Sequence, residues 1–155
     1  MAGRDAKLRV PKETRQHLKA KLKALFRQGR GRNLVRFMRE DLNPVIKGWI
    51  NYLALAAVKR FAEDVDGWVR RRLRLILWRR WQRPWTRRRT LMAAGLHEER
   101  AVMSAFNRRG PRWNSAASHM HAAFRKPFFD GLGLVSTVDE LFKLRVFHSE
   151  NRLGT

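Results

Sequence analysis

Arginine and tryptophan are concentrated in one segment of this sequence, WVRRRLRLILWRRWQRPWTRRR, which spans residues 68–89. The segment holds ten arginines, four tryptophans and no acidic residue. A guanidinium can bind phosphate through two parallel hydrogen bonds, and an indole ring offers a flat surface on which an unpaired base can stack. These residue types predict binding of a polyanion with exposed bases, so nucleic acid is the expected partner.

No arrangement of residues predicts catalysis or a metal site. The five histidines have no metal-binding spacing such as HExxH, and His119 and His121 do not share a helical face. The serines lack a nucleophile motif, and no aspartate pair lies in the strand-turn-strand pattern that two-metal polymerase chemistry needs. We therefore expect no catalytic residues, and neither a metal nor a cofactor of the protein's own.

The charge balance of the chain is strongly basic. Its 155 residues include 35 lysines and arginines against 13 aspartates and glutamates, a formal net charge of +22. This charge repels itself unless a polyanion neutralises it. The sequence has no cysteine for a disulfide or thiolate zinc site, no apolar run long enough to span a membrane, and no signal-peptide core. These features predict a cytoplasmic protein.

The fold class is predicted to be all-α, because apolar residues recur at helical spacing and alternating β-branched residues are sparse. Leu18, Leu22 and Phe26 mark the buried stripe of a first helix, and the GRGRN segment at residues 29–33 ends it. The pattern indicates a helical bundle, followed by a basic helical region with several short C-terminal helices.

Caps and prolines predict the helix boundaries. Asn33 is expected to cap a second helix, and Asn43 followed by Pro44 is typical of a new helix start. The helix at residues 61–83 is expected to end at Pro84. Short helices are predicted at residues 86–94, 97–107, 114–124 and 137–146, before a frayed tail at residues 148–155.

The helix predicted at residues 61–83 has two different faces. The apolar face consists of Val65, Val69, Leu73 and Ile76. The opposite face consists of Arg71, Arg74, Trp78 and Trp81. The apolar face can pack while the other contacts a ligand. For Trp78 and Trp81 two interpretations stay open, stacking on bases or packing in a core, because large aromatic side chains are usually buried.

The run LNPVIKGWINY at residues 42–52 resembles the signature of the group II intron maturase domain, in which Leu-Asn-Pro is followed by a basic residue, Gly-Trp and Asn-Tyr. The matching residues are Leu42, Asn43, Pro44, Lys47, Gly48, Trp49, Asn51 and Tyr52. Later family blocks are similar to DGWVRRRL at residues 66–73, RRGPRW at residues 108–113 and GLGLVS at residues 131–136. The resemblance covers about residues 8–147.

The resemblance implies a thumb followed by a maturase domain, as in the C-terminal part of group II intron reverse transcriptases. We expect a thumb-like helical region at residues 8–57, a maturase-type basic helical region at residues 58–147 and a flexible tail at residues 148–155. The sequence contains no Tyr-Ala-Asp-Asp motif, no fingers or palm sequence and no endonuclease segment.

By the same resemblance, the partner is an intron RNA, which the maturase region binds and helps to fold while the RNA and its Mg²⁺ perform the splicing reactions. A bacterial ribonucleoprotein is expected, in which Mg²⁺ enters only with the RNA and catalysis comes from the RNA or a partner chain.

The residues expected to contact RNA are chosen by charge, polarity and position. They are Lys47, Asn51, Tyr52, Arg70, Arg71, Arg74, Trp78, Arg79, Arg80, Trp81, Arg87, Arg88 and Arg89. The arginines are expected to contact phosphates rather than to read bases. Trp49 lies on the apolar stripe of its helix and is expected to be a core residue.

Three functions fit these patterns. The first is an RNA-binding maturase-type domain that assists folding and splicing of a group II intron without reverse-transcriptase catalytic residues. The second is a thumb and maturase subunit or fragment that completes a separately encoded reverse transcriptase. The third is a general basic protein that binds nucleic acid or an anionic membrane; the first two involve no membrane. The patterns do not determine the oligomeric state.

Overall fold

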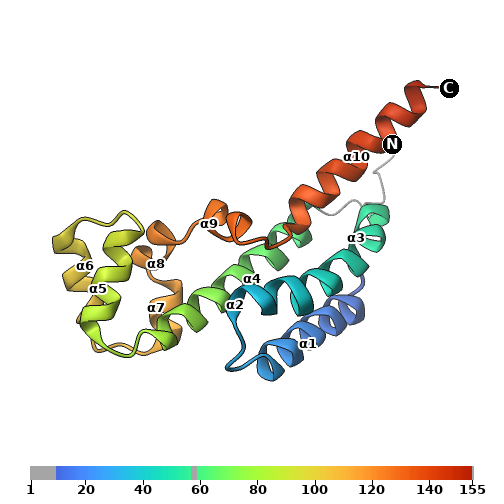
Figure 1. Cartoon of the computed structure of the whole chain (residues 1–155). Coiled ribbons are helices and arrows are strands. Elements are labelled where there is room, and N and C mark those ends of the chain that lie inside the picture. The colour runs from blue at the N-terminus through green and yellow to red at the C-terminus, as the bar shows by residue number, and fades with distance from the viewer. Residues whose placement is uncertain (1–9, 57–58, 155) are drawn as a thin grey trace, which may run out of the picture. The chain divides into compact units, whose positions relative to one another are not determined.

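A computed structural model describes residues 10–56 and 59–154, in which all regular secondary structure is helical (Figure 1). The elements are α1 Lys12–Gln28, α2 Leu34–Arg36, the π-helix η1 Phe37–Leu42, α3 Asn43–Ala56, α4 Lys59–Arg80, α5 Pro84–Ala93, α6 Glu98–Ala105, α7 Pro111–Ala116, α8 Ser118–Ala123, α9 Lys126–Gly131 and α10 Thr137–Leu153. The predicted all-α class is confirmed. Among the described helices, none combines the length and the apolar character that a membrane crossing needs.

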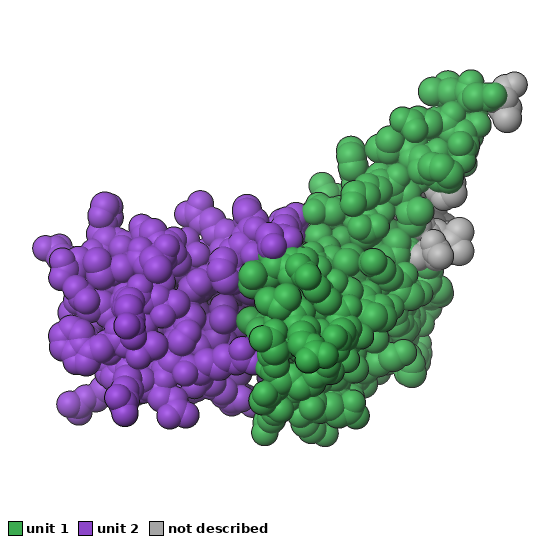
Figure 2. Space-filling view, viewed as in Figure 1, with its two compact units in different colours: residues 1–66, 132–155 green, residues 67–131 purple. Residues whose placement is uncertain are grey.

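The chain divides into two compact units (Figure 2). Unit 1 comprises residues 1–66 and 132–155, and unit 2 comprises residues 67–131. Helix α4 contributes its first part to unit 1 and the remainder to unit 2. These units are defined by packing, and the functional division into a thumb-like region at residues 8–57 and a maturase-type region at residues 58–147 stays a prediction; residues 8, 9, 57 and 58 lie outside the described residues.

The buried stripe predicted for α1 is confirmed. Leu18, Leu22 and Phe26 are buried, and the edge of Phe26 meets the ring of Phe37 with centroids 5.3 Å apart. Each such side chain contributes about 1.5–3 kcal/mol when it is removed from water. The described apolar core of unit 1 consists of Val10, Leu18, Leu22, Phe26, Leu34, Phe37, Met38, Leu42, Ile46, Ile50, Phe61, Ala62, Val65, Leu134 and Leu141.

The second helix begins as predicted, with the side chain of Asn33 accepting a hydrogen bond of 3.1 Å from the Arg36 N–H. The predicted new start at Asn43 and Pro44 is wrong, because helical backbone continues from residue 34 to residue 56. Here η1 widens the turn, and the Asn43 N–H bonds to the carbonyl five residues back. A widened turn relieves the clash between a proline ring and the carbonyl four residues before it, so the helix passes Pro44 without stopping.

The Asn43 side chain therefore does not cap a helix but holds a distant loop. Its Nδ2 donates to the Gly133 carbonyl at 2.7 Å, and its Oδ1 accepts from the Val135 N–H at 2.9 Å. Gly133 has a φ of 98°, and a Cβ at this position would lie 2.6 Å from Nε of Arg39. Glycine thus provides both the left-handed backbone and the space that the loop needs.

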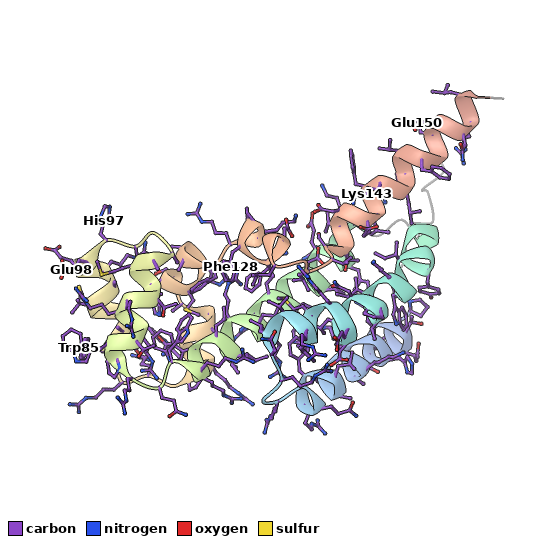
Figure 3. The ribbon with its side chains drawn as sticks, in the orientation of Figure 1. Trp85, His97, Glu98, Phe128, Lys143 and Glu150 are labelled. Atoms are coloured by element: carbon purple, nitrogen blue, oxygen red, sulfur yellow. The ribbon has the colours of Figure 1, made fainter. Side chains whose placement is uncertain are left out.

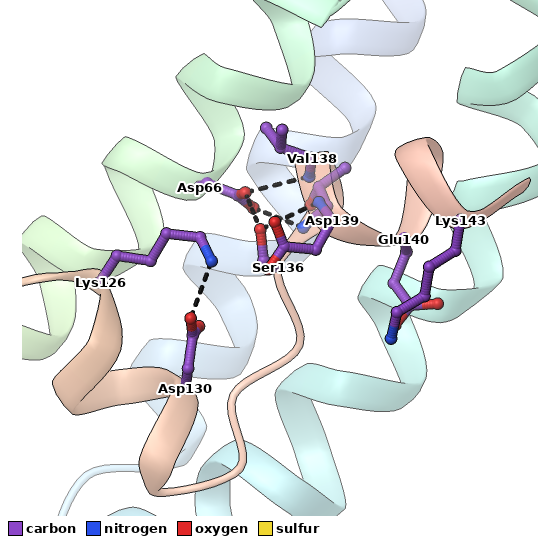
Figure 4. Close-up of polar contacts among 9 residues, drawn as sticks. Asp66, Lys126, Asp130, Ser136, Val138, Asp139, Glu140 and Lys143 are labelled. Carbon is purple, nitrogen blue, oxygen red and sulfur yellow. Dashed lines mark hydrogen bonds and ion pairs between the residues drawn. The ribbon is translucent and has the colours of Figure 1, made fainter. Parts of the chain in front are cut away.

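A buried carboxylate fixes the start of α10 (Figure 4). Asp66, at 5% exposure, accepts hydrogen bonds from the Ser136 hydroxyl at 2.7 Å, the Thr137 N–H at 2.8 Å and the Val138 N–H at 3.1 Å. The Ser136 hydroxyl also caps α10 by accepting from the Asp139 N–H at 3.3 Å. The free N–H groups and positive dipole of a helix N-terminus stabilise a negative charge, so Asp66 joins α4 to α10 within unit 1.

Several predicted boundaries in the second half of the chain change. The segment 114–124 is divided between α7 and α8, because the backbone at Ala117 is extended, with ψ 154°. Helix α9 lies where no helix was predicted. Helix α10 continues to Leu153, so helical structure extends into the tail at residues 148–155, whose flexibility stays a prediction.

Replacement of Asp66 by alanine is expected to destabilise unit 1. The change leaves three donors near Asp66 without their acceptor, and the free energy of unfolding in urea should fall by about 3 kcal/mol. Hydrogen exchange at the Thr137 and Val138 amides should accelerate. The control is Asp64→Ala, an exposed aspartate on the same helix. If exchange at these two amides were equal in Asp66→Ala and wild type, the assigned role of Asp66 would be incorrect.

Candidate nucleic-acid interface

The predicted RNA contacts have three different environments. The exposed ones are Lys47, Tyr52, Arg71, Arg79, Arg80 and Arg89; the half-buried ones are Arg70, Trp81, Arg87 and Arg88; and the buried ones are Arg74 and Trp78. The side chain of Asn51 lies outside the described residues. Unit 2 contains those on α4, on α5 and in the turn between these helices, and unit 1 contains Lys47, Asn51 and Tyr52.

Arg74 is held inside unit 2 instead of facing solvent. Only 5% of the residue is exposed, and Nε donates to the Phe124 carbonyl at 2.9 Å. Its guanidinium carbon lies 5.6 Å from the centroid of the Phe129 ring. Burial, together with the charge of Arg70, lowers the pKa of Arg74 to about 10. Arg74 therefore joins α4 to the segment that follows α8 and is not part of the exposed surface.

Trp78 is a core residue, with 1% of its surface exposed. Its ring lies 5.4 Å from that of His119 and 6.5 Å from that of Trp81, measured between centroids. The guanidinium carbon of Arg87 lies 4.5 Å from the centroid of the Trp78 ring. Of the two interpretations left open by the sequence, the structure supports core packing for Trp78.

Arg87 and Trp81 hold the turn between α4 and α5. Nε of Arg87 donates to the Trp81 carbonyl at 2.6 Å, and burial lowers the pKa of Arg87. Half-buried Trp81 also packs on Phe124, with ring centroids 5.4 Å apart. Arg87 thus positions the backbone just after the end of α4, and Trp81 stays partly accessible to solvent.

Three of the exposed arginines in the predicted set are available to a ligand, Arg71 and Arg79 on α4 and Arg89 on α5. Within the described parts of the chain, none of them has a hydrogen bond or an ion pair with a protein group. Unit 2 contains 16 basic and 3 acidic residues, a net charge of +13 over residues 67–131. Unpaired guanidinium groups on such a unit are suited to phosphate oxygens.

In unit 1, the edge of Tyr52 meets the ring of Trp49, with centroids 5.7 Å apart, and Trp49 lies 6.1 Å from the ring of His17. Trp49, expected to be core, is half-buried, whereas Tyr52 is 41% exposed. Lys47 is exposed on the same helix. These side chains can meet a ligand, and their role in RNA binding stays a prediction.

Sequence reasoning missed several exposed groups of the same chemical type. Trp85 is 65% exposed, and Trp113 is 46% exposed with the guanidinium carbon of Arg109 4.9 Å from its ring centroid. A row of exposed cations on α1 was also missed, formed by Lys12, Arg15, Lys19, Lys23 and Arg27. The exposure of Trp85 could have been predicted from helical spacing. Trp85 lies six positions before Leu91, the buried residue of α5, and this spacing places the two side chains on different faces of the helix.

Two histidines of unit 2, His119 and His121, have pKa values below the ordinary value. Burial, aided by the charge of Arg100, lowers the pKa of His119, whose Nε2 lies 3.0 Å from Oδ1 of Asn114. Burial also lowers the pKa of His121, with smaller effects from nearby arginines. Among the described residues no group of three or more histidine and carboxylate side chains could hold a metal ion.

A family model supports the resemblance. Residues 15–95, more than half of the chain, match the model described as group II intron, maturase-specific domain. The matched span includes LNPVIKGWINY and the basic run at residues 68–89, and the recognition made from these motifs is confirmed. Among curated proteins, none matches the chain.

Acidification is expected to destabilise unit 2 through His119. Its pKa in the folded chain lies below the ordinary value of 6.5, so the unfolded chain takes up a proton at higher pH than the folded chain does. Because stability falls where the unfolded state binds more protons, the free energy of unfolding should be lower at about pH 5.5 than at about pH 7.5. Urea unfolding followed by tryptophan fluorescence measures this, since five of the six tryptophans lie in unit 2.

The variant His119→Gln should show a smaller difference between the two pH values, because it removes one of the titrating groups. His97→Gln, at an exposed histidine of the same unit, is the control and should retain the wild-type difference. A pH dependence of His119→Gln as steep as that of wild type would contradict the role assigned to His119.

Proposed function

The chain belongs to the group II intron maturase-specific domain family, and on this basis we propose that it binds a group II intron RNA and helps that RNA to reach its splicing-competent fold. Family membership is the observation that carries the proposal. The charge of unit 2 supports it, because a folded RNA brings many phosphates close together and cations on a protein reduce their mutual repulsion.

The proposed binding surface uses outward arginines on a scaffold made by inward ones. Nε of Arg74 donates to the Phe124 carbonyl, which joins α4 to the segment after α8, and Nε of Arg87 donates to the Trp81 carbonyl, which joins α5 to the turn that precedes it. Arg71, Arg79 and Arg89 project from these helices and are proposed to bind phosphates. A rigid spacing between cations favours RNA segments whose phosphates have a matching spacing, because little side-chain and backbone freedom is then lost on binding.

No chemical step is assigned to the protein. The maturase-specific domain is not itself catalytic, and we propose that the intron RNA performs the splicing reactions with Mg²⁺ that it binds itself. The role of the protein is to hold and shape the RNA. We propose that it acts in the cytoplasm, as part of a bacterial ribonucleoprotein.

A second candidate function is that of a subunit which completes a separately encoded reverse transcriptase. Exposed apolar side chains on α10 favour a protein partner: Phe142 is 68% exposed and Val146 is 40% exposed, one helical turn apart. The two functions are compatible, since one chain can bind intron RNA through unit 2 and a protein through α10.

The proposed surface is tested by the salt dependence of RNA binding. Each phosphate contact contributes about 0.7 to 0.9 to the slope of log K against log salt concentration, so the variant R71Q/R79Q/R89Q should have a slope smaller by about 2 to 3 and weaker affinity. The control R15Q/K19Q/K23Q removes the same charge from exposed positions on α1. Equal reductions of the slope in both variants would show that binding follows total charge rather than this surface.

The proposed partner is tested by competition among a group II intron RNA, an unrelated structured RNA and duplex DNA of equal length. The intron RNA should bind at least about 10-fold more tightly, a difference of ~1.4 kcal/mol. The protein should also promote splicing at Mg²⁺ concentrations too low for the RNA alone. Equal affinity for all three nucleic acids would instead identify a general basic nucleic-acid-binding protein.

A further inference from the structure

The most exposed aromatic ring of unit 2 is that of Trp85. It lies in the first turn of α5, directly after Pro84, and 65% of the residue is exposed. Figure 3 shows its indole projecting outward at the surface of the unit. Tryptophan is highly buried on average, so an indole this exposed is unusual, and the proposed phosphate-binding arginines do not account for it.

Contacts with its neighbours hold the Trp85 ring in place. The ring meets Phe106 edge to face, with centroids 5.1 Å apart and planes at 83°. The guanidinium carbon of Arg88 lies 5.8 Å from the Trp85 centroid, and Nη2 of the same arginine bonds to Oε1 of Glu98 at 2.8 Å. These contacts anchor the ring to the start and the end of α6 while most of its surface stays accessible. A ring held in this way loses little freedom when it binds.

A shallow depression of about 470 Å³ lies beside the ring. Its lining residues are Trp85, Arg88, Arg89 and Met92, which share one face of α5 at spacings of three, four and seven residues. Arg89 is exposed and has no ion pair or hydrogen bond within the described residues, in contrast to Arg88. The surface thus combines a flat apolar ring, a flexible thioether and an unpaired cation.

We propose that this depression is a stacking site for one unpaired base of the bound RNA, with Trp85 against the base and Arg89 on an adjacent phosphate. The proposal rests on the proposed RNA-binding function and adds a class of ligand, a single-stranded or bulged nucleotide. A base within a duplex cannot reach the ring, because both of its faces are already stacked. The net charge of +13 on unit 2 favours a polyanion over an apolar protein segment as the occupant.

The experiment compares the affinities of the full chain for two probes, a short single-stranded oligoadenylate RNA and a blunt RNA duplex with the same number of phosphates. Trp85→Ala should weaken binding of the single strand by about 10-fold and leave duplex binding at its wild-type value, because loss of one stacked base affects the single strand alone. Trp85→Phe retains a ring and should recover most of the single-strand affinity.

The matched control is Phe142→Ala, which removes an aromatic ring of similar exposure, 68%, from unit 1. It should bind both probes as wild type does. Circular dichroism of each variant checks that the helices are intact.

The results separate this proposal from the proposed function. If the wild-type chain bound neither probe, both would be overturned. If it bound both probes with the expected salt dependence but Trp85→Ala changed neither affinity, or changed both equally, the stacking site alone would be overturned. An equal single-strand defect in Phe142→Ala would have the same consequence.

Discussion

The structure of unit 1 depends on one buried carboxylate, that of Asp66. Unit 1 is made from two separate stretches of chain, and Asp66 lies at the point where the first stretch leaves it. By accepting hydrogen bonds from Ser136, Thr137 and Val138, it binds the second stretch where that stretch returns. A buried charge is tolerated here because every described contact is a donor at a helix N-terminus, where partial positive charge accumulates. In the sequence, unit 2 is therefore inserted between the two stretches of unit 1, and the side chain of Asp66 connects these two stretches.

The same residue type has two opposite roles within unit 2. Arg74 and Arg87 have lowered pKa values because they are removed from water, and each uses a backbone carbonyl and an aromatic face in place of water. Arg71 and Arg89 remain in solvent and keep their hydrogen-bonding capacity for a ligand. Charge density alone does not identify a binding surface, since some of the charge in a basic helix supports the fold. The free energy available for RNA binding resides in the cations that the fold leaves unpaired.

The sequence was most predictive where one local rule determines the outcome. Leu18 and Leu22 on a helical stripe and Asn33 at a helix start behave as their spacing and side-chain chemistry require. Prediction failed where a residue serves a distant partner: Asn43 has the local pattern of a cap but binds a loop 90 residues later. The helical wheel separates an apolar from a basic face of α4 but does not show that part of the basic face is also packed, as the burial of Arg74 and Trp78 shows. Exposure of Trp85 likewise depends on how α5 packs on α6, which local periodicity does not encode.

The folding units extend beyond the part of the chain that the family model matches. The match ends at residue 95, and it includes both Asp66 and Arg74. The hydrogen-bond partners of Asp66 lie at residues 136–138, and the acceptor for Arg74 is the carbonyl of Phe124. A chain ending at residue 95 would leave a carboxylate and a guanidinium of the matched region without these partners, and an uncompensated charge in a packed interior is strongly destabilising. The matched region therefore carries the family signature, but the segment from residue 96 onward is required to satisfy its two buried charges.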